Sequence, residues 1–219
     1  MKRGYLQILL AAVLFLLALG LTMYPVVSNW YIGRHQSRIQ TEYREVLEQT
    51  DSAEIESIRK RAVAYNNTIT PGAAEEAYSQ KSIRLAAEDY VNQLNVSGSG
   101  IMGYVEIPKI GVDLPIYHGT GADSLDRGTG HLLGSSLPVG GESTHTIITG
   151  HSGMASQKMF TDLEQLREGD IFYLHVLDET LTYEVRKIHT VLPHDTTYLG
   201  IEPGEDLCTL VTCTPTGVN

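Results

Sequence analysis

Cysteine is scarce in this 219-residue sequence, which contains only Cys208 and Cys213. Two cysteines exclude a small domain held by many disulfides and a zinc site built from four thiolates. Basic residues are also in the minority, with 16 Lys and Arg against 26 Asp and Glu. The resulting net charge of −10 argues against a nucleic-acid partner, which would require a basic surface.

Several motifs of common catalytic sites are missing as well. The sequence has no P-loop, no dinucleotide-binding glycine motif and no His-Glu-x-x-His, so nothing indicates a nucleotide or a catalytic zinc. Acidic residues such as Asp123, Asp126, Glu142 and Asp162 lack the spacing of an EF-hand, which favours solvated loop acids over a calcium site. We therefore expect no metal and no cofactor.

A long apolar run without any charged side chain covers residues 6–27. As a helix it would extend about 33 Å, enough to cross a bilayer. Lys2 and Arg3 precede it, so the positive-inside rule predicts a cytoplasmic tail at 1–5 and an extracytoplasmic remainder. A cleaved signal peptide is the alternative, because 18–20 form a small-x-small site, but the apolar run continues beyond that site and favours a single-pass anchor.

Residues 28–96 are predicted to form a polar helical stalk that packs on the main domain. Asp51 followed by Glu54 resembles a capping box that opens a helix, and the positions sharing one face of that helix are Ile55, Ile58, Ala62 and Tyr65. Residues 66–80 contain Thr-Pro-Gly and small side chains, which indicates a loop. A further short helix is expected at 83–94.

After a Ser/Gly hinge at 97–100 the pattern changes to short strands separated by Gly and Pro turns. Strands are predicted at 103–107, 112–117, 145–149, 171–177, 181–192 and 207–212, with a short helix at 158–166. This pattern favours a mainly β domain, a small barrel or sandwich, over 97–219.

The two cysteines lie on one predicted strand but on opposite faces, because side chains alternate along a strand. Cys208 shares its face with Leu210 and is expected to be a buried structural thiol. Cys213 shares the other face with Thr209 and ends the strand before a turn, so its thiol could face a cleft. Spacing alone leaves open whether Cys213 is a nucleophile or a small buried hydrophobe.

A cysteine nucleophile needs a neighbouring base or imidazolium to populate the reactive thiolate. Among the eight histidines, position favours His151, which follows a predicted strand in Thr-Gly-His-Ser-Gly, or His131, which lies in a glycine-rich loop. His145 and His175 lie within strands and are expected to be structural. Position alone does not choose between the first two.

Two of these stretches resemble motifs of the sortase family. Residues 209–213, Thr-Leu-Val-Thr-Cys, are similar to the active-site sequence TLxTC, and residues 149–151, Thr-Gly-His, match the histidine motif. Further stretches similar to the pilus-building class C sortases lie at 103–110, 114–119, 130–141 and 159–163.

The resemblance implies a sortase-type β-barrel and a membrane-bound cysteine transpeptidase. Cys213 would attack the Thr–Gly bond of an LPxTG-type sorting signal, and His151 would serve as acid and base. Thr212 and Thr214 are expected to contact the substrate, and His131 becomes structural. In class C members the acceptor is a pilin lysine, so the implied partners are LPxTG-bearing pilins or surface proteins.

Two of the departures from the family bear on activity and on access to the site. Sortases carry an arginine shortly after the cysteine, which stabilises the oxyanion or positions the substrate, but no arginine follows Arg186 here. The expectation is therefore a C-terminally truncated chain that lacks the catalytic arginine and the last strand, is weakly active or inactive as it stands, and could also lack a second membrane helix. Many class C members have an Asp-Pro-aromatic lid, a motif absent from 66–80, so the presence of a lid stays open.

Two alternatives remain at this point. One is a housekeeping-type sortase that attaches surface proteins to peptidoglycan, against which the stretches at 103–119 and 130–141 argue. The other is a non-catalytic, sortase-like module that binds sorting signals, which only the missing arginine supports.

Overall fold

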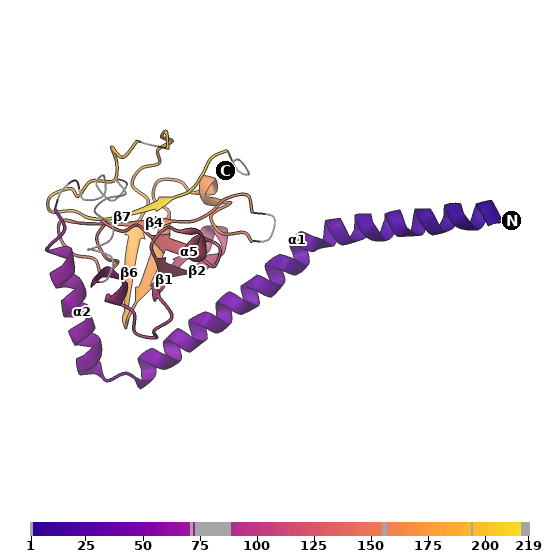
Figure 1. Ribbon diagram of the computed structural model, residues 1–219. Helices are drawn as coiled ribbons and strands as arrows, with labels where there is room; N and C mark the ends of the chain where they lie inside the picture. The colour runs from indigo at the N-terminus through magenta and orange to yellow at the C-terminus, as the bar shows by residue number, and fades with distance from the viewer. Residues whose placement is uncertain (1, 71, 73–88, 155–156, 194, 216–219) are drawn as a thin grey trace.

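The computed structural model of the chain describes residues 2–70, 72, 89–154, 157–193 and 195–215. A seven-stranded sheet in the order β6-β5-β1-β2-β3-β4-β7 curls into a nearly closed barrel, and two long helices, α1 and α2, lie outside it (Figure 1). The terminal strands of this order, β6 and β7, border an unsealed seam. The expectation of a mainly β barrel behind N-terminal helices is confirmed.

The pairing of the strands brings two of their ends to one rim of the barrel. Antiparallel pairs join β1 to β2 and β5, β5 to β6, and β3 to β4, whereas β2–β3 and β4–β7 are parallel. Because β4 and β7 run in the same direction with Thr149 opposite Val211, their C-terminal ends emerge together. The strand bounds are β1 (Ile101–Ile107), β2 (Val112–His118), β3 (Thr129–His131), β4 (Thr144–Thr149), β5 (Ile171–Val176), β6 (Glu179–Glu184) and β7 (Asp206–Val211).

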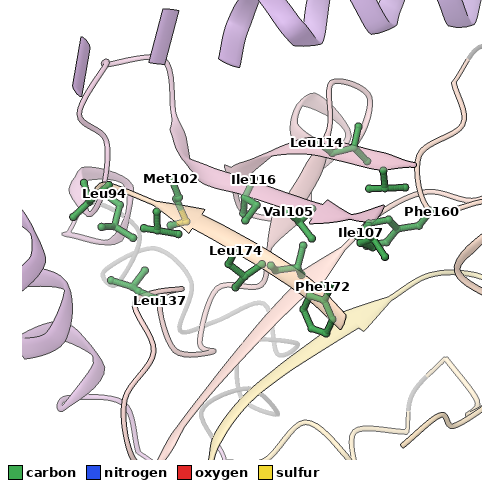
Figure 2. Packing of buried hydrophobic residues seen from close by; sticks show 14 of the residues in the cluster. Leu94, Met102, Val105, Ile107, Leu114, Ile116, Leu137, Phe160, Phe172 and Leu174 are labelled. Atoms are coloured by element: carbon green, nitrogen blue, oxygen red, sulfur yellow. The ribbon is translucent and has the colours of Figure 1, made fainter. Parts of the chain in front are cut away.

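Apolar side chains from the inward faces of the strands fill the barrel (Figure 2). In β1 the alternation of inward and outward side chains shifts by one residue. Met102 and Val105 both belong to the main core, whereas Tyr104 belongs to a second, outer cluster formed with Tyr43 and Tyr117. A register shift between Ile101 and Gly103 accounts for this, because one extra residue in a strand reverses the alternation. Both faces of β1 are consequently covered.

The two long helices pack on the barrel, as expected for the stalk. Helix α1 (Lys2–Gln49) is continuous, and Tyr43 near its end joins the outer cluster of β1 and β2. Helix α2 (Ser52–Asn66) begins where the Asp51 carboxylate accepts a hydrogen bond from Ala53 N at 2.7 Å, so the predicted N-cap is confirmed. The predicted face of α2 is buried in the main core through Ile55, Ile58 and Ala62.

The N-terminal part of α1 projects away from the barrel (Figure 1). Its segment Gly4–Tyr24 has a mean hydropathy of 2.5 and no buried share, so it is long and apolar enough to cross a membrane. This property is compatible with the expected anchor at 6–27 and equally with a signal peptide. The domain boundaries proposed from sequence stay predictions.

Three local expectations differ from the structure. The strand expected at 181–192 ends with β6 at Glu184, because β5 begins at Ile171 opposite Glu184 and offers no partner beyond it. The helix expected at 158–166 is a series of turns with a 3₁₀ segment, η2 (Leu163–Gln165), whose backbone bonds span three residues. Strand β3 was not expected, because Thr-Gly-His shows no alternation of its own.

Two expectations fall mostly outside the described residues. The loop at 66–80, and with it the question of a lid, lies largely there, as does most of the helix expected at 83–94. Further short elements are the 3₁₀ helix η1 (Pro108–Ile110) and helix α5 (Ala122–Leu125).

Candidate functional site

Cys213 and His151 leave adjacent strand ends at the same rim of the barrel. Each lies two residues beyond the last ladder pair, Thr149 of β4 and Val211 of β7. Neighbouring strands lie about 4.8 Å apart, so the two segments start side by side. Cys213 is exposed and His151 is half-buried, which leaves both side chains open to a ligand from solvent.

Hydrogen bonds continue between the two segments after the ladder ends. Gly150 N donates to Val211 O at 3.0 Å, and the Thr212 hydroxyl donates to Gly150 O at 2.8 Å. The Ser152 hydroxyl donates to the carbonyl oxygen of Cys213 at 2.6 Å. Residues on both sides of His151 therefore hold the chain that carries Cys213.

The loop beyond His151 returns beneath it and supports its main chain. Phe160 N donates to His151 O at 3.0 Å, and the Phe160 ring is fully buried against Gly150. Gln157, which is also buried, donates its side-chain amide to Asp126 O at 2.7 Å. The core thus anchors the turn on which His151 sits.

Two carboxylates lie at the rim of this site. Asp126, just after α5, approaches His151 with Oδ1 4.0 Å from Nε2. Glu164 in η2 accepts a hydrogen bond from the Thr214 hydroxyl at 2.5 Å, directly after Cys213. Asp126 is largely exposed, so its electrostatic effect on His151 is weakened by solvent. Sequence patterns identified Asp126 only as a solvated loop acid and gave no signal for Glu164.

The two threonines expected to contact substrate lie on either side of Cys213. Thr212 donates its hydroxyl to Gly150 O and Thr214 donates its hydroxyl to Glu164, so both hydroxyl protons are engaged within the protein. Their role toward a substrate remains a prediction. Ser152 and Gln157 were not singled out from the sequence, because their contacts join segments far apart in the chain.

His131 is shielded from solvent and has a structural environment. It is fully buried, donates from Nε2 to Ser136 O at 2.8 Å, and lies 2.9 Å from the Tyr90 hydroxyl at Nδ1. Burial lowers the pKa of His131 to about 4, so the ring stays neutral near neutral pH. Of the two histidines that position favoured, His151 and not His131 lies on the chain segment next to that of Cys213.

The remaining candidates from sequence also have structural environments. His145 is buried and donates to Gly200 O at 2.7 Å, while Nε2 accepts from the Thr209 hydroxyl at 2.7 Å. Cys208 packs on the core through the inner face of β7, and burial raises the pKa of its thiol. Both cysteines are free, as their opposite faces predicted.

Three arginines have partners within the protein. The Arg127 guanidinium lies 4.4 Å from the ring centroid of Tyr117, and Arg167 donates to Glu164 O at 2.8 Å. Arg186, the last arginine of the sequence, pairs with Glu205 at 3.2 Å. Within the described parts of the chain, no three His, Cys, Asp or Glu side chains gather as a metal site would require.

An exposed thiol and a half-buried imidazole carried on neighbouring, hydrogen-bonded chain segments are suited to nucleophilic acyl transfer. The thiol can supply the nucleophile, and the imidazole can move protons to and from a leaving or entering amine.

Known proteins of one family are similar to this chain in sequence and in architecture. The profile of the family described as sortase domain matches residues 105–219. The crystal structure of sortase C from Streptococcus pneumoniae is 43% identical, with a TM-score of 0.72 over 81% of this chain and 88% of that one. Sortase C1 from Streptococcus agalactiae is 42% identical, with a TM-score of 0.74 over 83% of this chain and 92% of that one.

A curated relative matches nearly the whole chain. Sortase A of Streptococcus agalactiae serotype III (strain NEM316) is 25% identical over 214 residues, which cover 96% of this chain and 79% of that protein. The profile match takes in β4 and β7 with both strand ends of the candidate site. Sequence, barrel and relatives therefore agree that this chain belongs to the sortase family of cysteine transpeptidases.

Proposed function

We propose that this chain is a membrane-anchored sortase that cleaves LPxTG-type sorting signals between Thr and Gly and joins the acyl product to a pilin lysine. The observation that carries the proposal is the exposed Cys213 at the end of β7 beside His151 at the end of β4. Resemblance to class C structures supports the choice of a pilin, since the S. pneumoniae sortase C structure is described in terms of pilin substrate specificity.

In the first half-reaction the Cys213 thiolate attacks the Thr carbonyl carbon of the Thr–Gly bond. The tetrahedral intermediate collapses, the C–N bond breaks, and protonated His151 gives its proton to the departing glycine amine. The acyl group is left as a thioester on Cys213. Neutral His151 is then ready to act as a base.

In the second half-reaction a lysine amine attacks the thioester carbon. His151 takes a proton from that amine, the C–S bond breaks, and the Cys213 thiolate is regenerated beside a protonated imidazole. One amide is exchanged for another, so bond energy is conserved and no nucleotide is consumed. The chain's own part is to hold the thiol and imidazole together on two fixed strand ends.

The apolar segment of α1 supports an extracytoplasmic location for the barrel. Gly4–Tyr24 would cross the membrane with Lys2 and Arg3 on the cytoplasmic side. The catalytic domain would then face the outer surface, where its protein substrates emerge.

The test compares Cys213→Ala with Cys208→Ala in the full chain in detergent micelles. With an LPxTG-type peptide, mass spectrometry should detect a thioester adduct for wild type and Cys208→Ala, even if it forms slowly, and none for Cys213→Ala. Iodoacetamide should label the exposed Cys213 faster than the inward Cys208. An adduct that persists in Cys213→Ala would refute the assignment.

The amine that the enzyme accepts in the second half-reaction distinguishes the proposal from its alternatives. A pilin lysine should resolve the thioester into an isopeptide bond, whereas preference for a cell-wall peptide amine would indicate a housekeeping-type sortase. Binding of the peptide without any thioester in wild type would indicate a non-catalytic module.

A further inference from the structure

Ser152 is a buried side chain placed between the two residues of the candidate site. Only 1% of it is exposed, and it follows His151 directly in the sequence. Its hydroxyl donates to the Cys213 carbonyl at 2.6 Å across 61 residues of chain. Because Thr149 and Val211 form the last ladder pair, this contact lies where the β4–β7 ladder no longer holds the two segments together.

A second hydroxyl makes the reciprocal contact. Thr212, just before Cys213, donates to the carbonyl of Gly150, just before His151, at 2.8 Å. We call the pair of bonds Ser152–Cys213 and Thr212–Gly150 the hydroxyl latch. Each segment thus supplies one donor and one acceptor, and the latch extends the fixed register of β4 and β7 past the end of the sheet.

We infer that Ser152 is a positioning residue that fixes the main chain of Cys213, and through it the starting position of the thiol, relative to the imidazole of His151. The inference rests on the proposed function, in which these two groups act together. Its consequence is large because a misplacement of about 1 Å between reacting groups can cost roughly 100-fold in rate. The Ser152 hydroxyl itself touches the backbone of Cys213.

Ser136 offers a matched control. It is also a serine with 1% exposure, and its hydroxyl accepts a hydrogen bond from His145 N at 3.0 Å. Loss of either hydroxyl leaves a backbone group without that partner, so both alanine variants should lose similar stability. The difference is that the Ser136 contact joins neither Cys213 nor His151.

The experiment measures the rate of Cys213 alkylation by iodoacetamide between pH 5 and 9 in the full chain in detergent micelles, with His151→Ala as reference. This readout needs no turnover. In Ser152→Ala the rate near neutral pH should fall about fivefold or more and the pH profile should move toward that of His151→Ala, because the imidazole no longer faces the thiol reliably. In Ser136→Ala rate and profile should stay within about twofold of wild type, while the melting temperature falls in both serine variants.

Thr212→Val tests the other half of the latch if Ser152→Ala does not fold. Valine matches threonine in shape at this half-buried position, and the same slowing is expected. Where turnover is measurable, kcat should fall in Ser152→Ala with little change in KM.

Two results would overturn the inference, and they differ from each other. In the first, Cys213 is alkylated slowly in His151→Ala, but Ser152→Ala and Thr212→Val keep the wild-type rate and pH profile. That result would show that the hydroxyl latch does not position Cys213, and it would leave the proposed function intact. In the second, His151→Ala leaves the rate of Cys213 alkylation unchanged. That result would show that His151 does not act on Cys213, and it would contradict the proposed function as well.

Discussion

Gly150, between the end of β4 and His151, lies under the ring of Phe160. A Cβ atom at Gly150 would lie 2.7 Å from Cδ2 and 2.9 Å from Cγ of that ring. Phe160 is fully buried in the core and its backbone bonds to His151. The missing side chain at Gly150 therefore lets the supporting loop close against the strand that presents His151.

Gly150→Ala is expected to destabilise the fold by about 1–3 kcal/mol, because an added methyl must displace either a buried ring or the strand end. Displacement of the strand end would also move His151, so peptide cleavage should fall together with the melting temperature. Thermal unfolding followed by circular dichroism measures the first effect.

Gly121→Ala is the matched control, since Gly121 has a φ of −74° and a Cβ there would meet no neighbouring atom within 4 Å. Equal melting temperatures for the two alanine variants would show that Phe160 does not constrain Gly150.

At the scale of elements, hydrogen bonds from buried polar side chains hold α1 against the barrel. The Tyr43 hydroxyl donates to Met102 O at 3.1 Å and accepts from Leu177 N at 3.2 Å, so one side chain ties α1 to β1 and to the end of β5. Gln40 donates to the Asp113 carboxylate at 2.6 Å. Burial raises the pKa of Tyr43 to about 12, which keeps this phenol protonated.

Tyr43→Phe should lower the free energy of unfolding by about 1–3 kcal/mol, because the substitution keeps the ring but leaves two backbone groups without a partner. Urea denaturation of the full chain in detergent would measure the shift of the midpoint. Tyr31→Phe on the same helix, where the side chain is 69% exposed, should leave that midpoint unchanged. Identical midpoints for both variants would contradict a structural role of the Tyr43 hydroxyl.

At the scale of the whole molecule, buried histidines link stability to pH. Folding lowers the pKa of His131 from 6.5 to about 4, chiefly because burial disfavours the charged ring, and burial also lowers the pKa of His145. Between pH 4 and pH 6.5, His131 is largely protonated in the unfolded chain and largely neutral in the folded chain. The stabilisation is therefore fully present above pH 6.5 and is lost as the pH falls toward 4.

For His131 alone the loss amounts to about 3 kcal/mol at most. We expect the urea midpoint of wild type to fall steadily from pH 7 to pH 4 and to fall less in His131→Gln, which has no titratable ring. The raised pKa of Asp113 acts in the opposite sense, because the folded chain takes up that proton more readily. A His131→Gln variant with the same slope as wild type would exclude His131 as a source of the pH dependence.

Local patterns predicted most of the strands, and a family resemblance supplied the two residues of the candidate site. Alternation along the chain predicted β1, β2, β4, β5 and β7 to within two residues, because each of these strands buries one face or both. The resemblance of Thr-Leu-Val-Thr-Cys and Thr-Gly-His to sortase motifs, rather than their spacing, pointed to Cys213 and His151. The same patterns predicted a strand that continues past the end of β6, because they do not show where the pairing with the partner strand β5 ends. They missed β3, because three residues are too few to show an alternation.

The arrangement around those residues was decided only by the tertiary structure. Parallel pairing of β4 with β7 places the segment of His151 beside the segment of Cys213, whereas His131 is fully buried. Ser152 reaches Cys213 across 61 residues and Tyr43 reaches Leu177 across 134. No periodicity within a short window can encode such contacts, because they depend on which segments the nearly closed barrel places side by side.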